Sequence, residues 1–296
     1  MEISIIPVNP EDFVPRHVPP YVEIDNELEV LEDHFEASTH EKIMPVLFEG
    51  PPGVGKTLCF AEFARRKKCP IIQADLAEDT RRSNLIGKFV PIGDKIYFSL
   101  GVLPTAIEVA NAYGAAVLVL EEISACPPRI QKLLNQMLDW RFHVYVDEIG
   151  KVFRLREGAR LLVGATTNPT IWGETGELNP DLRSRFYIID FGYPSREKEL
   201  EILKVYGVKD KWMAEKLVVL ANETRAAAAR YQISMGLSPR DLVQAAKAYE
   251  TYASGGMNDN EAIIAALRHA ILWKYENEED RKFVSQRIES IFGVSV

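Results

Sequence analysis

Hydrophobic and polar residues follow two different patterns along this chain, and the change falls near Pro194. Before it, short uninterrupted apolar runs alternate with stretches in which apolar residues recur every three or four positions. Uninterrupted runs are typical of parallel strands covered on both faces, and the alternation is typical of βαβ units. After Pro194, the consecutive stretches have helical spacing. We therefore predict an α/β domain over residues 45–194 and an all-α domain over residues 195–296.

The N-terminal segment and two shorter stretches do not follow this pattern. Residues 1–44 contain five prolines near their start and then an acidic patch with helical spacing, so we expect an extended lead-in and one helix. Turn residues between β-forming residues around 89–97 and around 142–158 predict two β-hairpins within the α/β domain.

The composition fits a globular intracellular protein. The chain has 296 residues, 47% hydrophobic and 26% charged, enough for two domains with full cores. No apolar run reaches the length of a membrane span, and the first residues lack the features of a signal peptide. The net charge of −8 argues against a basic face for duplex DNA, and three cysteines without a C-x-x-C pair argue against a zinc site. We expect a cytoplasmic protein.

The strongest motif is a phosphate-binding loop, G-x-x-x-x-G-K-[ST], within the stretch VLFEGPPGVGKT. A strand-like run enters the loop and a helical stretch leaves it, so phosphates would meet a helix N-terminus. Glycines let backbone N–H groups turn toward phosphate oxygens, lysine supplies a positive charge and the threonine hydroxyl ligates Mg²⁺. The candidate nucleotide-binding residues are Gly50, Pro51, Pro52, Gly53, Val54, Gly55, Lys56 and Thr57.

Two adjacent glutamates end the apolar run that begins at Ala116. Ligands of parallel sheets bind beyond the carboxyl ends of the strands, where Glu121 and Glu122 would lie. One acid should hold Mg²⁺, and the next should orient and deprotonate the attacking water. If Glu121 were the base, the metal position would fall on Leu120, which has no ligand atom. We therefore assign Glu121 to the metal and Glu122 to the base.

Asn168 ends the next buried strand, in the stretch ARLLVGATTNP. Its amide both donates and accepts hydrogen bonds and suits the positioning of a water against a γ-phosphate. An Asn-Pro pair also forms ordinary strand-end turns. Its place in the order, after the phosphate loop and the acid pair, favours the functional interpretation.

The chain carries the phosphate loop, the acid pair and Asn168 in that order, followed by LRSRF and then GLSPRDL. This order resembles that of the AAA+ ATPases. The two hairpins and the stretch ELNPDLRSRFYIIDFGYP narrow the resemblance to the MoxR branch, most like its CbbQ/NorQ/GvpN-type members. It covers about residues 45–253. The implied fold is α/β: a P-loop NTPase core of parallel sheet with helices on both faces, followed by a small helical lid domain. The first hairpin would be a partner-facing insertion, although a packed surface hairpin remains the alternative.

The resemblance also implies roles for three arginines and for the acids. Arg185 matches the arginine finger that reaches into a neighbouring subunit's site, and Arg183 beside it would assist. Arg240 matches the second sensor, on the helical lid. Without the family context, Arg183 and Arg185 would be an exposed basic pair. Glu122 would be the catalytic glutamate, whereas Glu121 departs from the usual aspartate.

The implied activity is ATP hydrolysis with Mg²⁺ in a homo-oligomer, a hexameric ring. Such a motor or chaperone remodels, activates or assembles a partner protein, and the family's partners include client proteins and von Willebrand A-type adaptors. One alternative is an NTPase subunit of a nucleic-acid-processing complex, against which the net charge of −8 weighs. The other is a slow nucleotide switch, which the glutamate at position 121 would support.

Overall fold

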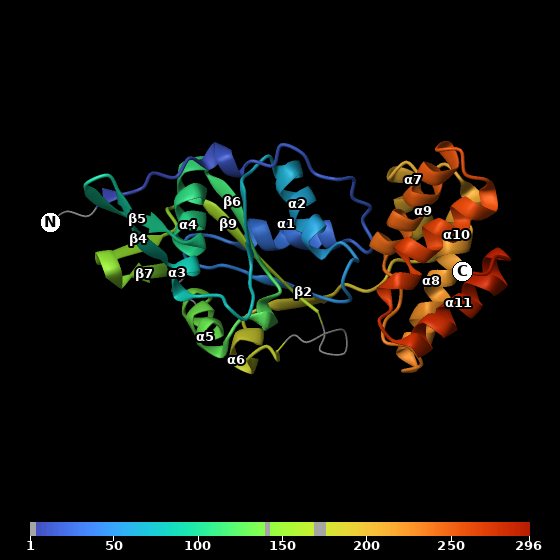
Figure 1. Ribbon diagram of the computed structural model, residues 1–296. Helices are drawn as coiled ribbons and strands as arrows, with labels where there is room; N and C mark the ends of the chain where they lie inside the picture. Colours follow the sequence, from blue (N-terminus) through green and yellow to red (C-terminus); the bar gives the residue numbers. More distant parts are fainter. Residues whose placement is uncertain (1–3, 140–142, 169–175) are drawn as a thin grey trace. The chain divides into compact units, whose positions relative to one another are not determined.

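The structure, a computed structural model, describes residues 4–139, 143–168 and 176–296. The chain forms two compact units, whose elements are labelled in Figure 1. The first unit comprises Met1–Pro19, Asp25–Gly50 and Gly55–Phe191. The second comprises Pro20–Ile24, Pro51–Val54 and Gly192–Val296.

A five-stranded sheet lies at the centre of the first unit. Its strand order is β10-β2-β9-β6-β3, and every neighbouring pair is parallel. The prediction of a parallel sheet from uninterrupted apolar runs is therefore confirmed. The strands are β2 (Val46–Glu49), β3 (Ile71–Asp75), β6 (Ala115–Glu121), β9 (Arg160–Thr167) and β10 (Tyr187–Asp190).

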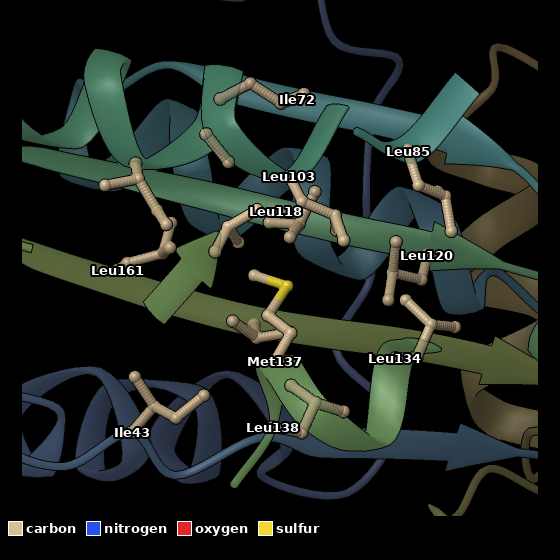
Figure 2. Close-up of a cluster of buried hydrophobic side chains, with 14 of the residues drawn as sticks. Ile43, Ile72, Leu85, Leu103, Leu118, Leu120, Leu134, Met137, Leu138 and Leu161 are labelled. Atoms are coloured by element: carbon tan, nitrogen blue, oxygen red, sulfur yellow. The ribbon is translucent and has the colours of Figure 1, made fainter. Parts of the chain in front are cut away.

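Helices cover both faces of this sheet because successive residues of a strand point to opposite sides. On one face, Leu118 and Leu120 of β6 belong to a buried cluster with Leu103, Leu134 and Met137 (Figure 2). The last three residues come from two helices, α4 (Val102–Tyr113) and α5 (Pro128–Met137).

On the opposite face, the helix that follows the phosphate loop packs closely on the sheet. This helix is α2 (Lys56–Lys67), and its Phe60 stacks on Phe48 of β2 with ring centroids 4.5 Å apart. A Cβ atom on Gly164 of β9 would lie 2.3 Å from the Phe60 ring, so the absence of a side chain at Gly164 allows this approach. Phe48 of β2 and Gly164 of β9 thus allow α2 to lie close to this face of the sheet.

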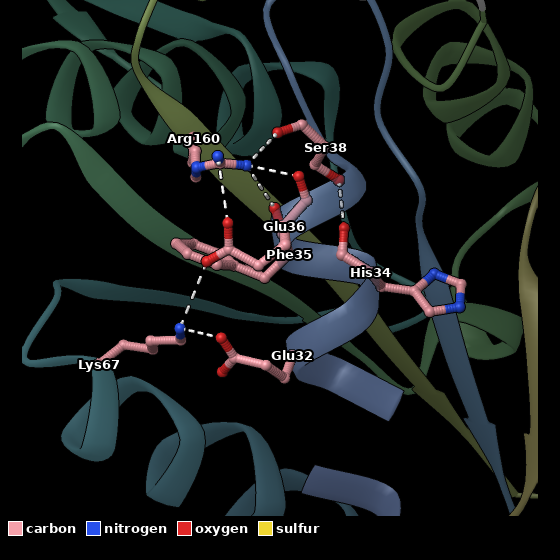
Figure 3. Close-up of polar contacts among 7 residues, drawn as sticks. All are labelled: Glu32, His34, Phe35, Glu36, Ser38, Lys67 and Arg160. Atoms are coloured by element: carbon pink, nitrogen blue, oxygen red, sulfur yellow. Dashed lines mark hydrogen bonds and ion pairs between the residues drawn. The ribbon is translucent and has the colours of Figure 1, made fainter. Parts of the chain in front are cut away.

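Polar contacts fix the N-terminal helix α1 (Glu27–Ala37) to the same unit (Figure 3). Arg160 at the start of β9 donates to the backbone carbonyl of Glu36 at 2.5 Å and lies 3.1 Å from the Glu36 carboxylate. Lys67 at the end of α2 pairs with Glu32 and Glu36. An arginine beside the last carbonyls of a helix satisfies acceptors that lack intrahelical partners. The predicted N-terminal helix is confirmed.

Both predicted hairpins are present. β4 (Gly87–Ile92) pairs antiparallel with β5 (Lys95–Leu100), and β7 (His143–Val146) pairs antiparallel with β8 (Lys151–Arg154). Residue 142, at which the second hairpin is predicted to begin, lies outside the described residues. Pro169, the proline of the Asn-Pro pair that follows the next buried strand, also lies outside them. The shorter helices of the unit are η1 (Pro10–Phe13), α3 (Arg82–Leu85), η2 (Ile123–Ala125), η3 (Asp147–Ile149) and α6 (Pro180–Arg183).

The lead-in differs from the expected extended segment in two respects, the helix η1 and a short paired strand. Strand β1 (Ser4–Ile5) pairs parallel with β5, with Ser4 opposite Tyr97. Two residues are too few for a strand to appear in the hydrophobic pattern, so the prediction missed this strand.

Helices make up the second unit in the part of the chain that the structure describes. Side chains cap several of them, as expected from the polar residues at their starts: Ser195, Asp210 and Asn258 each accept a hydrogen bond from a backbone N–H of the first turn. No described helix has both the length and the apolar character needed to cross a membrane. The helices are α7 (Arg196–Val205), α8 (Lys211–Ala229), α9 (Pro239–Ser254), α10 (Asp259–Ala270), η5 (Leu272–Lys274) and α11 (Glu278–Phe292).

Candidate active site

The carboxyl ends of the central strands lie in register along one edge of the sheet. Glu49 of β2 pairs with Thr167 of β9, and Asp75 of β3 pairs with Glu121 of β6. Parallel sheets bind their ligands at this edge. The register therefore brings the acid pair, the end of the Asn168 strand and the start of the phosphate loop to one place.

The phosphate loop leaves β2 at Gly50 and enters α2 at Lys56. Gly55 has a φ of 107°, in the left-handed region that glycine adopts without steric strain. A Cβ atom on Gly50 would lie 2.0 Å from the carbonyl oxygen of Phe191, so Gly50 packs directly against that backbone. The first N–H groups of α2 have no intrahelical acceptors and, as in other such loops, suit an anion.

Lys56 links the loop to the end of β9. Its Nζ donates to the carbonyl oxygen of Gly50 at 2.7 Å and to Oδ1 of Asn168 at 2.8 Å. Only 8% of Lys56 is exposed, so its charge lies in a largely desolvated position. The lysine of the motif and the predicted γ-phosphate sensor therefore meet, although 112 positions separate them in sequence.

Thr57 and Glu121 form a second contact in the same site. The Thr57 hydroxyl donates to Oε2 of Glu121 at 2.5 Å, and the Gln73 amide donates to Oε1 at 3.2 Å. Burial is the main cause that raises the pKa of Glu121, and the nearby Asp75 raises it further. A bound cation would offset both effects.

These oxygen donors fit Mg²⁺. Mg²⁺ prefers oxygen ligands and usually keeps several waters while it binds one or two carboxylates and the phosphates of a substrate. No group of three or more histidine, cysteine or acidic side chains in the described ranges could by itself hold a metal ion. A site built on the Thr57 hydroxyl and the Glu121 carboxylate would thus depend on nucleotide phosphates and water for its remaining ligands.

Glu122 has an unusual backbone conformation. Its φ and ψ are 51° and 46°, in the left-handed region, which is uncommon for residues other than glycine. Its N–H donates to the hydroxyl of Thr166 at 3.2 Å, and the next turn is held by a 2.7 Å hydrogen bond between Ser124 and Thr167. Strained conformations of this kind concentrate at functional sites. The Glu122 side chain is exposed at the edge where the acid pair was expected.

The two arginines of the LRSRF stretch have different surroundings. Arg183 ends α6 and forms a bidentate pair with Glu49, in which Nη1 lies 3.0 Å from Oε1 and Nη2 lies 2.6 Å from Oε2. Arg185 is exposed, and its Nε donates to Oδ1 of Asn135 at 2.9 Å. Arg183 is thus held by a carboxylate of its own chain, and its role as an assistant of Arg185 stays a prediction.

Arg240 lies at the second position of α9, in the second unit. The helix begins with a capping box, in which the Asp241 carboxylate accepts hydrogen bonds from the N–H and the hydroxyl of Ser238, both at 2.7 Å. Lys274 pairs with Asp241 from η5. The start of this helix is thus well fixed within its unit, and the role of Arg240 as a sensor stays a prediction.

Sequence reasoning missed four residues that contact the predicted ones: Glu49, Gln73, Asn135 and Thr166. Glu49 could have been found, because it ends a buried strand directly before the phosphate loop, as Glu121 ends another. Gln73 lies on β3, and nothing in the neighbouring sequence indicates its contact with Glu121. Asn135 lies on α5, and no motif marks it.

Two parts of the chain match known protein families. Residues 45–186 match the AAA domain (dynein-related subfamily), and residues 199–286 match the CbbQ/NirQ/NorQ C-terminal family. Protein NorQ of Paracoccus denitrificans is 27% identical over 259 residues, which cover 88% of this chain and 90% of that protein. Protein CbbQ of Hydrogenophilus thermoluteolus is 26% identical over 271 residues, 92% of this chain and 94% of that protein.

Two further similarities are more limited. Chaperone MoxR1 of Mycobacterium tuberculosis is 32% identical over 164 residues, which cover 55% of this chain and 40% of that protein. A mutant of Thermotoga maritima RuvB aligns with a TM-score of 0.52 at 17% identity, over 92% of this chain and 79% of that chain. At this identity, the RuvB similarity shows the fold alone.

Fold and site together define a P-loop NTPase with an appended helical domain. The chain belongs to the MoxR branch of the AAA+ proteins, with a C-terminal region of the CbbQ/NirQ/NorQ type. The family resemblance noted in the sequence and the predicted fold class are both confirmed.

Proposed function

We propose that this protein binds ATP with Mg²⁺ at the carboxyl edge of the sheet and hydrolyses it. The observation that carries the proposal is the convergence of two long-range contacts, Lys56 with Asn168 and Thr57 with Glu121. These pairs join the phosphate loop to the ends of two different strands. Membership of the AAA+ family, which implies nucleotide binding with a divalent metal, supports the same assignment.

Each residue has a separate task in this proposal. Lys56 binds the β- and γ-phosphates, and Asn168, which contacts Lys56, orients the attacking water and responds to the γ-phosphate. Thr57 and Glu121 hold Mg²⁺, which when bound neutralises charge on the phosphate oxygens. Glu122 accepts the proton of the water. Its exposed side chain and left-handed backbone support this role, because they direct a carboxylate at the sheet edge away from the packed core.

The active site is completed by a second copy of the chain. Arg185 is exposed, and among the described residues it has an amide partner but no carboxylate partner. Such a cation supports the role of a finger that stabilises the transferring phosphate of a neighbouring subunit, in a ring that we expect to be hexameric. Arg240 would contribute a further cation from the helical domain.

The work done with ATP is the remodelling, activation or assembly of a partner protein. The similarity to NorQ, CbbQ and a protein named Chaperone MoxR1 supports a chaperone-like role. The partner would be a client enzyme or a von Willebrand A-type adaptor.

Glu122→Gln tests the proposal, because it keeps the shape of the side chain and removes the base. We expect ATP to bind with little change while steady-state hydrolysis falls by about 10²–10⁴-fold, the usual contribution of a general base. Glu157→Gln is a matched control, since Glu157 is an exposed glutamate in the β8–β9 turn. Equal hydrolysis by wild type and Glu122→Gln would contradict the assignment.

The same variant distinguishes the alternative functions. If Glu122→Gln binds a partner protein stably in the presence of ATP and Lys56→Ala does not, the result would support the remodelling function. Hydrolysis that is stimulated by DNA or RNA, without any retained protein, would favour the nucleic-acid alternative. A wild-type protein that binds ATP but does not turn it over would be a nucleotide switch.

A further inference from the structure

The contrast between Arg183 and Arg185 suggests how the finger is held. The guanidinium of Arg183 is matched by both oxygens of the Glu49 carboxylate, in the planar fork that makes such pairs strong and directional. The contact with Glu49 also raises the pKa of Arg183. Asn135 takes one of the five guanidinium N–H groups of Arg185, the one on Nε. Within the described residues, the Nη groups of Arg185 therefore stay available for an anion.

Glu49 lies at a position that connects the phosphate loop to these arginines. It is the last residue of β2, and Gly50 of the loop follows it directly. Its carbonyl oxygen accepts a 2.7 Å hydrogen bond from the N–H of Phe191, and its carboxylate reaches α6 through Arg183. The Glu49 side chain is 25% exposed and the Arg183 side chain is 40% exposed, so water partly screens this ion pair and its bidentate geometry carries its directionality.

We propose that Glu49 is a positioning residue for the arginine finger: by pairing with Arg183, it fixes the end of α6 so that Arg185 is presented to the nucleotide of a neighbouring copy. This inference rests on the proposed function. It gives the two arginines different tasks, because Arg183 anchors the segment within its own subunit and Arg185 acts across the interface. It also couples the finger to the strand that enters the phosphate loop of the same subunit.

Glu49→Gln is the primary test, because glutamine keeps the size of the side chain and loses the charge that Arg183 pairs with. A misplacement of about 1 Å in a catalytic group can cost about 10²-fold in rate, so we expect kcat to fall by roughly 10- to 100-fold. The affinity for ATP should stay within about twofold, since a finger acts mainly on the transition state. Asp190→Asn is the matched control, because Asp190 pairs in register with Glu49 and its substitution removes the same charge from the same edge of the sheet. The kcat of this control should equal that of wild type.

Mixing experiments then locate the defect. Lys56→Ala subunits have an inactive nucleotide site but an intact finger, so they should restore activity when they are mixed with Glu49→Gln subunits. Arg185→Ala subunits lack the finger, so they should give no restoration with Glu49→Gln. If Lys56→Ala fails to rescue Glu49→Gln although it rescues Arg185→Ala, Glu49 acts on its own loop and the inference is wrong.

Exchange of the two charges gives an independent measurement. Glu49→Lys and Arg183→Glu should each lower kcat. The double variant can form the ion pair with the charges reversed, so its kcat should be at least tenfold higher than that of the less active single variant. Unchanged kcat in Glu49→Gln, or no recovery in a folded double variant, would overturn the inference while leaving the proposed function intact. An inactive wild-type protein, or a fully active Arg185→Ala variant, would instead overturn the proposed function and this inference together.

Discussion

Arg225→Met should strongly destabilise the helical unit, because it leaves a carboxylate buried without its cation. Arg225 of α8 pairs with Glu199 of α7 at 2.5 Å, and the two side chains are 9% and 1% exposed. Arg225 also donates from Nε to the carbonyl oxygen of Leu237 at 2.7 Å and stacks over the ring of Tyr193 at 4.1 Å. Leu237 directly precedes the capped start of α9, so this network holds the segment that leads to Arg240.

The expected magnitude follows from the burial of the pair. Removing one partner of a buried ion pair typically costs about 3–5 kcal/mol, because the remaining charge stays desolvated. Oε2 of Glu199 already has no hydrogen-bond partner among the described residues, so little is left to stabilise the charge once Arg225 is gone. The double variant Glu199→Leu/Arg225→Met should lie within about 2 kcal/mol of wild type, since replacing both partners with apolar side chains is often neutral.

The pair Arg287–Glu223 supplies a matched control. It joins α11 to α8 in the same unit at 3.7 Å, and its side chains are 46% and 42% exposed. Arg287→Met should therefore cost about 0–1 kcal/mol. Urea unfolding followed by far-ultraviolet circular dichroism measures all four proteins. A loss below about 1 kcal/mol for Arg225→Met, or a double variant less stable than that single variant, would refute the reasoning.

The same variant has a predicted pH dependence. Burial raises the pKa of Glu199 above its usual 4.5, and Arg225 opposes that rise. Without Arg225 the pKa should rise further, so the folded protein would bind more protons than the unfolded chain at pH values above 4.5. A carboxyl with a raised pKa favours the folded state at low pH, and this contribution is lost as the pH rises through the folded-state pKa. The loss of stability should thus be smaller at about pH 5 than at about pH 8.

Three further predictions concern other parts of the chain. Lys56→Ala should weaken ATP binding by roughly 10- to 100-fold, the loss of charge-assisted hydrogen bonds, and unchanged affinity of the folded variant for a fluorescent ATP analogue would contradict the loop assignment. Glu121→Asp withdraws the carboxylate from Thr57 and Gln73, so half-maximal activity should need roughly tenfold more Mg²⁺; a faster enzyme would mean that the glutamate slows hydrolysis. Burial raises the pKa of Cys126 to about 11, so iodoacetamide should alkylate it slowly at about pH 8 until the protein unfolds, and rapid labelling of the folded protein would contradict its burial.

Short-range sequence patterns were sufficient to predict much of the fold and several residues of the candidate site. The phosphate loop is a continuous stretch whose glycines, lysine and threonine act through their immediate neighbours, so Lys56 and Thr57 could be identified directly. The strands and helices also follow from short-range periodicity, and the acid pair is marked by its place after an apolar run. Since parallel strands end at a common edge, the meeting of Glu121 with the loop could be expected before the structure was known.

The tertiary structure decided the contacts that no periodicity encodes. Glu49 and Arg183 are 134 positions apart, and nothing in the sequence around either residue indicates that they form an ion pair. The contact of Gln73 with Glu121 and the hydrogen bond from the Glu122 N–H to the Thr166 hydroxyl both depend on which strands are neighbours. Such contacts depend on strand order and side-chain direction in three dimensions, whereas a sequence records only the spacing of residues along the chain.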